Sequence, residues 1–287
     1  MRLVFLGTPA TAVPPLHALI DAGHEVALVV TRADKRRGRG TDVTASPVKQ
    51  AAIALGLPVS HRVDDVIGVG ADLGVVVAFG QLIKPHVLAE VPMVNLHFSL
   101  LPRWRGAAPV ERAILAGDDV TGVCVMAVEE GLDTGGIYAL ERVRIRPDET
   151  ADELRARLVE IGAPLLVDVL ARPGGIGEPA PQEGEPTYAA KITPEELELD
   201  WSKPAGELAR LPRVGKAWTT FRGRRLLVVQ AHAVAGSGPP GVIDGLTVWA
   251  GDGGVELVRV QPEGKPVIDA AAWRNGARPQ PGERLGA

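Results

Sequence analysis

Short apolar runs alternate with segments of helical periodicity through the first half of the chain. Five runs have the length and β-branched composition of strands: Leu3–Leu6, Val26–Val30, Leu73–Ala78, Val94–Phe98 and Val123–Val128. Four segments between them have the spacing of helices: Thr11–Ala22, Ser46–Leu55, Ile83–Leu88 and Ala108–Leu115. This β-α-β order predicts an α/β domain with a parallel sheet covered on both faces, which binds ligands beyond the carboxyl ends of its strands.

The second half changes character twice. A long helix is predicted over 151–170, with apolar residues spaced along one face. Residues 172–204 are rich in Pro, Gly and Glu without periodicity, which is typical of a linker. Four short strands with turn residues between them then predict a small, OB-like β-barrel: Arg224–His232, Gly241–Ile243, Thr247–Ala250 and Val255–Val260. We therefore expect a first domain over 1–171, a linker over 172–204 and a second domain over 205–287.

Composition restricts the class of protein. Hydrophobic residues make up 46% and charged residues 23%, a globular balance. The single cysteine, Cys124, lies in an apolar run, so we expect a buried, inert thiol, no disulfide, and a reducing compartment, the cytoplasm. The apolar run at the N-terminus is too short for a signal peptide, and no run approaches the roughly 18 apolar residues of a membrane span. We expect no membrane insertion and a monomer.

Two polar clusters follow predicted strands. Asn95 and His97 alternate along one strand, so they share a face of it and present an amide beside an imidazole. A histidine satisfied inside the core is an equally good explanation of His97 alone. Asp133 lies in the glycine-containing stretch 130–136 after the next strand, where an ordinary turn is the simpler interpretation.

Taken together, these three side chains suit formylation of an amine. Asn95 and His97 can donate hydrogen bonds to the oxyanion that forms when an amine attacks a carbonyl carbon. Asp133 can orient His97 and help to remove protons from the amine, directly or through water. We expect no metal.

Longer motifs around these residues resemble the methionyl-tRNA formyltransferase family. The similarity includes residues 5–9, 38–40, 46–49 and 75–80, the signature over 95–109, and the stretches 117–118, 132–135 and 261–265, and thus extends over nearly the whole chain. The turn over 211–218 departs from the family pattern, which leaves only the local path there open. The resemblance implies a Rossmann-like formyltransferase domain followed by an OB-like domain that contacts tRNA.

The resemblance also implies the substrates and their sites. The formyl donor would be 10-formyltetrahydrofolate and the acceptor methionyl initiator tRNA, with Asn95, His97 and Asp133 in the catalytic positions. The expected folate-binding residues are Ser99, Leu100, Leu101, Pro102, Phe79, Gly80, Gln81 and Leu82.

Positive charge gathers in two places. The stretch 31–49 is basic and follows the second strand on the ligand side of the sheet, so it suits a phosphate backbone better than a plain solvated surface. We expect tRNA contacts from Lys35, Arg36, Arg37, Arg39 and Lys49. Residues 205–287 carry 11 basic and 7 acidic side chains, and the arginines there are either a second phosphate track or ordinary surface charges.

Three alternatives remain from the sequence. A formyltransferase for glycinamide ribonucleotide or an amino sugar would use the same three side chains, but it would leave the basic loop and the second domain unexplained. A dinucleotide-binding oxidoreductase would need a Gly-x-Gly-x-x-Gly motif after the first strand, which Gly7-Thr8-Pro9 does not provide. A noncatalytic RNA-binding protein would not need the polar trio.

Overall fold

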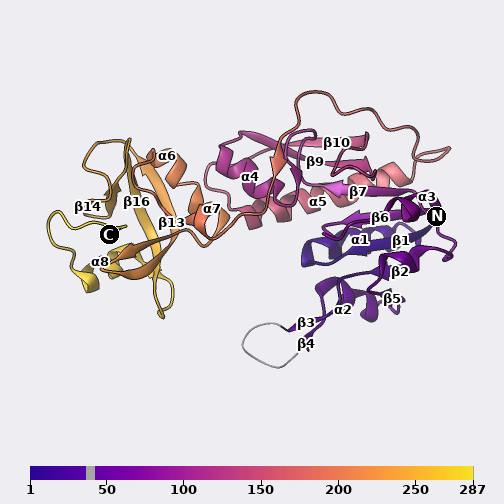
Figure 1. The fold of residues 1–287 in the computed structure, drawn as a ribbon, viewed down its shortest axis with the longest axis horizontal. Coiled ribbons are helices and arrows are strands. Elements are labelled where there is room, and N and C mark those ends of the chain that lie inside the picture. Colours follow the sequence, from indigo (N-terminus) through magenta and orange to yellow (C-terminus); the bar gives the residue numbers. More distant parts are fainter. Residues whose placement is uncertain (37–42, 287) are drawn as a thin grey trace. The chain divides into compact units, whose positions relative to one another are not determined.

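A computed structural model describes residues 1–36 and 43–286 of the chain. These residues form two compact units (Figure 1). The first comprises Met1–Pro109, Val120–Arg144 and Arg155–Ala190, and the second comprises Val110–Asp119, Ile145–Leu154 and Lys191–Ala287. Each unit is described by itself below.

A seven-stranded sheet, ordered β10-β9-β7-β6-β1-β2-β5, forms the centre of the first unit. Four of the predicted strands are parallel neighbours: β1 (Arg2–Gly7), β2 (Glu25–Val30), β6 (Leu73–Val77) and β7 (Met93–His97). A fifth parallel strand, β5 (Val59–Ser60), pairs with β2 and was not predicted. Residues 3–6 of β1 have no exposed surface, although successive side chains point to opposite faces. The sheet is therefore covered on both faces at its centre, which explains why its strands are continuous apolar runs.

The expectation of a wholly parallel sheet is wrong at one edge. Both β9 (Val120–Ala127) and β10 (Ile137–Arg144) are antiparallel to their neighbours, and Cys124 of β9 lies opposite His97 of β7. A parallel neighbour requires a connection that crosses back to the other end of the sheet. The segment between β7 and β9 makes no such crossing, so β9 starts beside the end of β7 and runs in the opposite direction.

The predicted helices are present, and capping side chains mark the start of two of them. The helices in this part of the chain are α1 (Val13–Asp21), α2 (Pro47–Ala54), α3 (Pro85–Glu90), α4 (Pro109–Ala116) and α5 (Ala151–Leu170), with 3-10 turns at Ala10–Ala12 and Val63–Val66. Ser46 begins α2, because its side chain accepts a hydrogen bond from the Lys49 amide. Thr150 and Glu153 form a reciprocal capping box at the start of α5.

Helix α5 covers one face of β7. A Cβ atom added at Gly162 would lie 2.8 Å from Val123 and 3.2 Å from Leu96, so the helix backbone packs closely on these strands. Leu96 points to the face opposite Asn95 and His97. The packing of α5 therefore leaves the face with the amide and the imidazole for other segments.

Two short ladders complete the first unit. Strands β3 (Lys35–Arg36) and β4 (Val43–Thr44) pair antiparallel. Strands β8 (Arg105–Gly106) and β11 (Tyr188–Ala189) pair in parallel, so part of the segment expected as a linker, 172–204, belongs to this unit.

The second unit contains an antiparallel sheet, ordered β12-β13-β16-β15-β14, with β17 also on β16. Its elements are β12 (Trp218–Phe221), β13 (Arg224–Val234), β14 (Ile243–Asp244), β15 (Thr247–Trp249), β16 (Gly254–Pro262), β17 (Ile268–Asp269), α6 (Ala205–Leu208), α7 (Leu211–Val214), α8 (Ala270–Ala277) and a 3-10 turn at Glu195–Leu197. Leu208, Val248 and Val255 are completely buried in its core. Within the described parts of the chain no pairing joins β12 to β14, so a closed barrel stays a prediction.

No helix among the described residues is long and apolar enough to span a membrane.

Candidate active site

Strand β7 carries the candidate amide and imidazole. Asn95 pairs with Val76 of β6 on one side and with Met126 of β9 on the other, which places it near the middle of the sheet. Asn95 is half-buried, whereas the His97 side chain is only 5% exposed. The two side chains lie on the same face, as predicted, and β6 and β9 hold them on both sides.

Both ring nitrogens of His97 have neighbours. Nε2 lies 3.0 Å from the carbonyl oxygen of Trp104, and because a carbonyl only accepts, Nε2 carries a proton and donates it. Nδ1 lies 3.7 Å from Oδ2 of Asp133, beyond hydrogen-bond length but close enough for strong electrostatic attraction to a charged ring. The backbone of Trp104 thus fixes the ring orientation, and Asp133 faces the second nitrogen.

Asp133 reaches His97 by an indirect path. Because β9 is antiparallel, its end lies beside the start of β7, where the Val128 amide donates to the carbonyl of Met93. The loop 128–136 must therefore fold back along β7 to bring its carboxylate to His97. The Gly106 amide donates to Oδ2 of Asp133 at 2.7 Å and fixes the carboxylate there.

The backbone of this loop is conformationally constrained. Asp133 has a φ of 51°, in the left-handed region, which costs a non-glycine residue on the order of 1 kcal/mol and is tolerated best by Asn and Asp. A Cβ atom at Gly135 would lie 2.0 Å from the carbonyl oxygen of Ala127, so the loop passes too close to β9 for any side chain there. Surrounding contacts must hold this conformation in place.

The segment after β7, expected to bind folate, turns sharply behind the site. Ser99 is completely buried and its hydroxyl donates to the carbonyl of Arg103 at 2.6 Å. Leu101 is 7% exposed and packs with Cys124 and Met126, Pro102 follows a cis peptide bond, and Leu100 is half-buried. The Ser99 and Leu101 side chains thus shape the segment that carries the Trp104 carbonyl.

The second segment expected to bind folate, Phe79 to Leu82, follows β6. Val77 pairs with Leu96, so this segment leaves the sheet beside the residues that follow His97. Phe79 is 3% exposed and packs in the core, Gly80 has a φ of 66°, Gln81 is half-buried, and Leu82 is 77% exposed. The Arg32 guanidinium donates to the Gly80 carbonyl and anchors the turn. The two segments therefore leave neighbouring strands at the same edge of the sheet.

The basic residues expected to contact tRNA are only partly described. Lys35 and Arg36 form β3, while Arg37 and Arg39 lie outside the described residues. Lys49, on α2, donates from its ammonium group to Asp34 at 2.6 Å, and both side chains are largely buried. The Lys49 charge is therefore balanced locally by Asp34.

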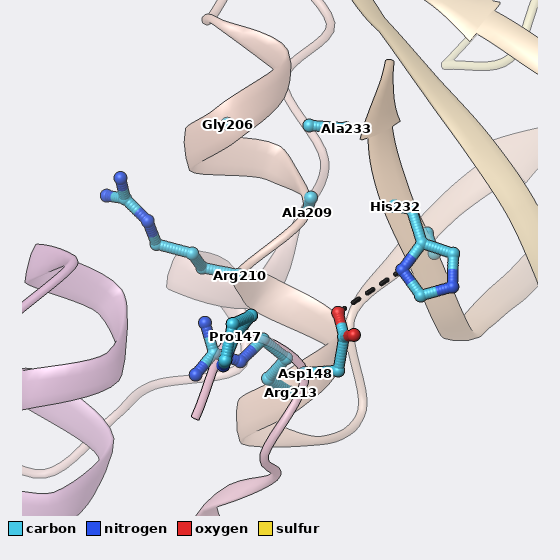
Figure 2. A pocket seen from close by; sticks show the side chains of 9 residues that line it. Pro147, Asp148, Gly206, Ala209, Arg210, Arg213, His232 and Ala233 are labelled. Atoms are coloured by element: carbon cyan, nitrogen blue, oxygen red, sulfur yellow. Dashed lines mark ion pairs between the residues drawn. The ribbon is translucent and has the colours of Figure 1, made fainter. Parts of the chain in front are cut away.

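Arginines of the second unit line a polar hollow of about 370 Å³, drawn in Figure 2. Arg210 donates to the carbonyl of Leu115, and its side chain points away from the pair formed by His232 and Asp148, whose Nδ1 and Oδ1 are 3.3 Å apart. Arg213 donates to the carbonyls of Glu149 and Arg146, and burial lowers the pKa of its guanidinium. These two arginines thus bind backbone of their own unit.

Two residues of the site were missed from the sequence. Gln182 donates to the carbonyls of Asp133 and Gly135, and Thr187 accepts a hydrogen bond from the Trp104 amide. Both lie in the Pro- and Glu-rich segment expected as a linker, which has no periodicity that could have singled them out. Among residues 1–36 and 43–286, no group of three or more His, Cys, Asp and Glu side chains could hold a metal ion.

Cys124 lies directly opposite His97 in the sheet, and we predict that its thiol is unreactive in the folded protein. It is completely buried, and mainly because of this burial the pKa of its thiol is raised from 9.0 to about 12. The thiol should therefore stay protonated and unlabelled by iodoacetamide in the native protein at pH 8, and it should react fully once guanidinium chloride unfolds the chain. Because the folded pKa is the higher one, this group favours folding below pH 9, and that contribution is lost as the pH rises toward 12. Fast labelling of the native protein would contradict this.

Comparison with known proteins identifies the family of the chain. The family model "Formyl transferase" matches residues 1–170, and "Formyl transferase, C-terminal domain" matches residues 191–278. These two matches cover most of the chain, which is therefore a formyl transferase. A methionyl-tRNA formyltransferase of Roseobacter denitrificans is 46% identical over 96% of both chains, and the chain belongs to the methionyl-tRNA formyltransferase family.

Two solved structures share the fold at low sequence identity. The N-formyltransferase of Helicobacter canadensis, in complex with folinic acid and dTDP-3-aminofucose, has a TM-score of 0.71 at 16% identity, with 91% of this chain and 99% of that one covered. The methionyl-tRNA formyltransferase of Clostridium thermocellum has a TM-score of 0.59 at 18% identity, with 81% and 93% covered. The fold is thus common to this chain, an N-formyltransferase and a methionyl-tRNA formyltransferase.

Proposed function

We propose that the chain transfers the formyl group of 10-formyltetrahydrofolate to the α-amino group of methionine on initiator tRNA, as a step of translation initiation. The observation that carries this proposal is the face of β7, where Asn95 and His97 lie together and the Asp133 carboxylate is 3.7 Å from the ring. The methionyl-tRNA formyltransferases similar to this chain support the choice of acceptor.

The geometry suggests a role for each catalytic residue. The Asn95 amide donates a hydrogen bond to the oxyanion that forms when the amine attacks the formyl carbon. Nε2 of His97 is held by the Trp104 carbonyl, so the ring donates to the oxyanion from Nδ1 when that nitrogen is protonated. Asp133 stabilises the charged ring and accepts the proton that the amine loses, directly or through water. The carbon–nitrogen bond to the folate then breaks, and its nitrogen regains a proton.

We propose that the folate lies between the two segments at the carboxyl edge of β6 and β7. Residues 79–82 and 99–102 leave adjacent strands at that edge, which is where α/β sheets bind ligands. The related Helicobacter canadensis structure contains folinic acid, a formylated folate, which supports a folate as the donor. The exposed Leu82 offers apolar surface for the pteridine ring.

We propose that the acceptor stem of the tRNA meets the basic segment that contains Lys35, Arg36, Arg37, Arg39 and Lys49. Arg39→Ala is expected to raise the KM for methionyl-tRNA about tenfold and to reduce the salt slope of tRNA binding by about 1, because one phosphate contact is lost. The KM for folate should not change. Arg142→Ala, which removes an exposed arginine of β10, is the matched control. An equal loss of folate affinity in Arg39→Ala would contradict this division of labour.

We also propose how the chain divides into domains. We infer a formyltransferase domain over 1–171, a linker over 172–204 whose residues up to Ala190 pack with the first unit, and an OB-like domain over 205–287 that contacts tRNA through its excess of basic side chains. We further propose that the enzyme works as a cytoplasmic monomer. Light scattering at the working concentration tests this, and a dimer mass would refute it.

An acceptor panel tests the function. The purified chain and 10-formyltetrahydrofolate are mixed with methionyl initiator tRNA, methionyl elongator tRNA or a nucleotide-linked amino sugar, and the products are analysed by mass spectrometry. Formylmethionine on the initiator tRNA alone is the expected result. Formylation of the amino sugar instead would establish the second candidate, which shares the fold and the folate chemistry.

A further inference from the structure

Gln182 lies outside both family matches, which cover residues 1–170 and 191–278. Its amide nevertheless makes four hydrogen bonds next to the candidate catalytic residues. Nε2 donates to the carbonyl of Asp133 at 2.9 Å and to that of Gly135 at 2.8 Å. Oε1 accepts from Nε and from a terminal nitrogen of Arg105, at 3.1 and 2.6 Å.

These bonds use the full capacity of the amide and fix its orientation. A primary amide has two N–H donors and two acceptor lone pairs, and here each has a partner. Carbonyl oxygens only accept and a guanidinium only donates, so the amide cannot be flipped without losing all four bonds. A carboxylate at this position could still accept from Arg105, but it could not donate to the loop.

Residues near Gln182 in the sequence bind both the loop that carries Asp133 and the backbone around Trp104. Ala180 exchanges two backbone hydrogen bonds with Ile137, at the end of the loop that carries Asp133. Thr187 accepts from the Trp104 amide, and β11 pairs with β8 directly after Trp104. Residues 180–189, which we call the strap, thus hold the carbonyl that binds Nε2 of His97 and the loop that brings Asp133 to Nδ1.

We propose that Gln182 is a positioning residue for formyl transfer, which holds the Asp133 carboxylate against His97. This inference rests on the proposed catalytic role of Asp133. The need for such a residue follows from the fold: the loop enters from the far end of β7, and Asp133 has a left-handed backbone. Gly106 restrains the carboxylate of Asp133, and Gln182 restrains its carbonyl. Protein groups use all four hydrogen-bonding sites of the amide, so we assign Gln182 a positioning role and no hydrogen bond to a substrate.

Gln182→Glu tests the proposal most directly. The glutamate side chain keeps the shape of glutamine and still accepts from Arg105, but it lacks the two N–H donors to the loop. We expect kcat to fall about 10- to 100-fold, as for a displacement near 1 Å, while the KM values for folate and tRNA change less than about threefold. Gln182→Ala should show the same pattern. Glu183→Ala, which removes the exposed neighbouring side chain, is the matched control and should leave kcat unchanged. Melting temperatures of all variants report whether they are folded.

A double-mutant cycle separates positioning from a general structural effect. If Gln182 acts through Asp133, then Gln182→Glu will cause little further loss of kcat in an Asp133→Asn background. The inference would be overturned if the loss of kcat in the double variant equalled the product of the losses in the two single variants. It would also be overturned if a folded Gln182→Glu variant kept the kcat of the wild type. The wild-type protein tests the proposed function separately. If the wild type formylates methionyl-tRNA and the Gln182 variants are equally active, only the role of Gln182 is refuted.

Discussion

Replacement of His97 by alanine is expected to lower kcat for formylation of methionyl-tRNA by about 10³-fold or more. The variant loses a donor to the oxyanion, which alone is typically worth about 10²–10³ in rate, and it leaves Asp133 without the ring that it would stabilise. It also removes the hydrogen bond of 3.0 Å that His97 donates to the Trp104 carbonyl. The measurement is single-turnover formylation with saturating folate and tRNA, which reports the chemical step rather than product release.

His17→Ala is the matched control for this variant, because His17 is exposed on α1 in the same unit. The control should retain wild-type turnover, and circular dichroism should show both variants folded. Full turnover in a folded His97→Ala variant would remove the imidazole from the mechanism.

Replacement of Asp133 by asparagine is expected to lower kcat by about 10²–10³-fold with little effect on folding. Asparagine tolerates the left-handed backbone at this position, and its side-chain oxygen can still accept from the Gly106 amide. The variant therefore removes the negative charge that faces His97 and the proton acceptor, but not the shape of the loop. The measurement is kcat as a function of pH, together with the melting temperature.

The control for the aspartate is Asp148→Asn, in the second unit, where the carboxylate is 74% exposed and pairs with His232. This change should leave kcat as in the wild type. If Asp133→Asn were equally active, the carboxylate would have no part in proton removal. A large drop in melting temperature would instead indicate that the loop depends on the charge for its conformation.

Strands and helices of the first unit could be predicted because their signal is local. The apolar runs of β1, β2 and β6 are buried on both faces, and Ser46 and Pro47 mark the start of α2 within two residues. Strand β10 was missed, because only Val143 of its eight residues is buried and charged residues occupy three of its last four positions, Glu141, Arg142 and Arg144. An edge strand of this kind is stabilised by its pairing with β9 rather than by its own composition.

The proximity of Asp133 to His97 could be hypothesised, but not its structural cause. In a wholly parallel sheet the turn after β9 would emerge at the same edge as the residues after His97. In the antiparallel arrangement observed, the loop leaves from the opposite end and returns along β7. What brings the residues together is hydrogen bonding to Gly106 and Gln182, residues 27 and 49 positions away in the sequence. No periodicity or motif encodes such contacts.

The contact between the Trp104 carbonyl and His97 could not be predicted from the sequence either. The sequence indicated His97 as a donor, but the residue that fixes its orientation acts through its backbone, so the identity of its side chain carries no signal. The backbone of Trp104 has a φ of 64° and is itself held by the Thr187 hydroxyl. Such a contact becomes visible only when the path of the chain is known.

A crystal structure of the wild type with a non-transferable analogue of 10-formyltetrahydrofolate would test the central claim most directly. We predict that the formyl oxygen lies about 3 Å from both the Asn95 amide nitrogen and Nδ1 of His97, with the pteridine beside residues 79–82. A formyl group bound beyond roughly 5 Å from both side chains would contradict the account, because neither could then donate to the oxyanion.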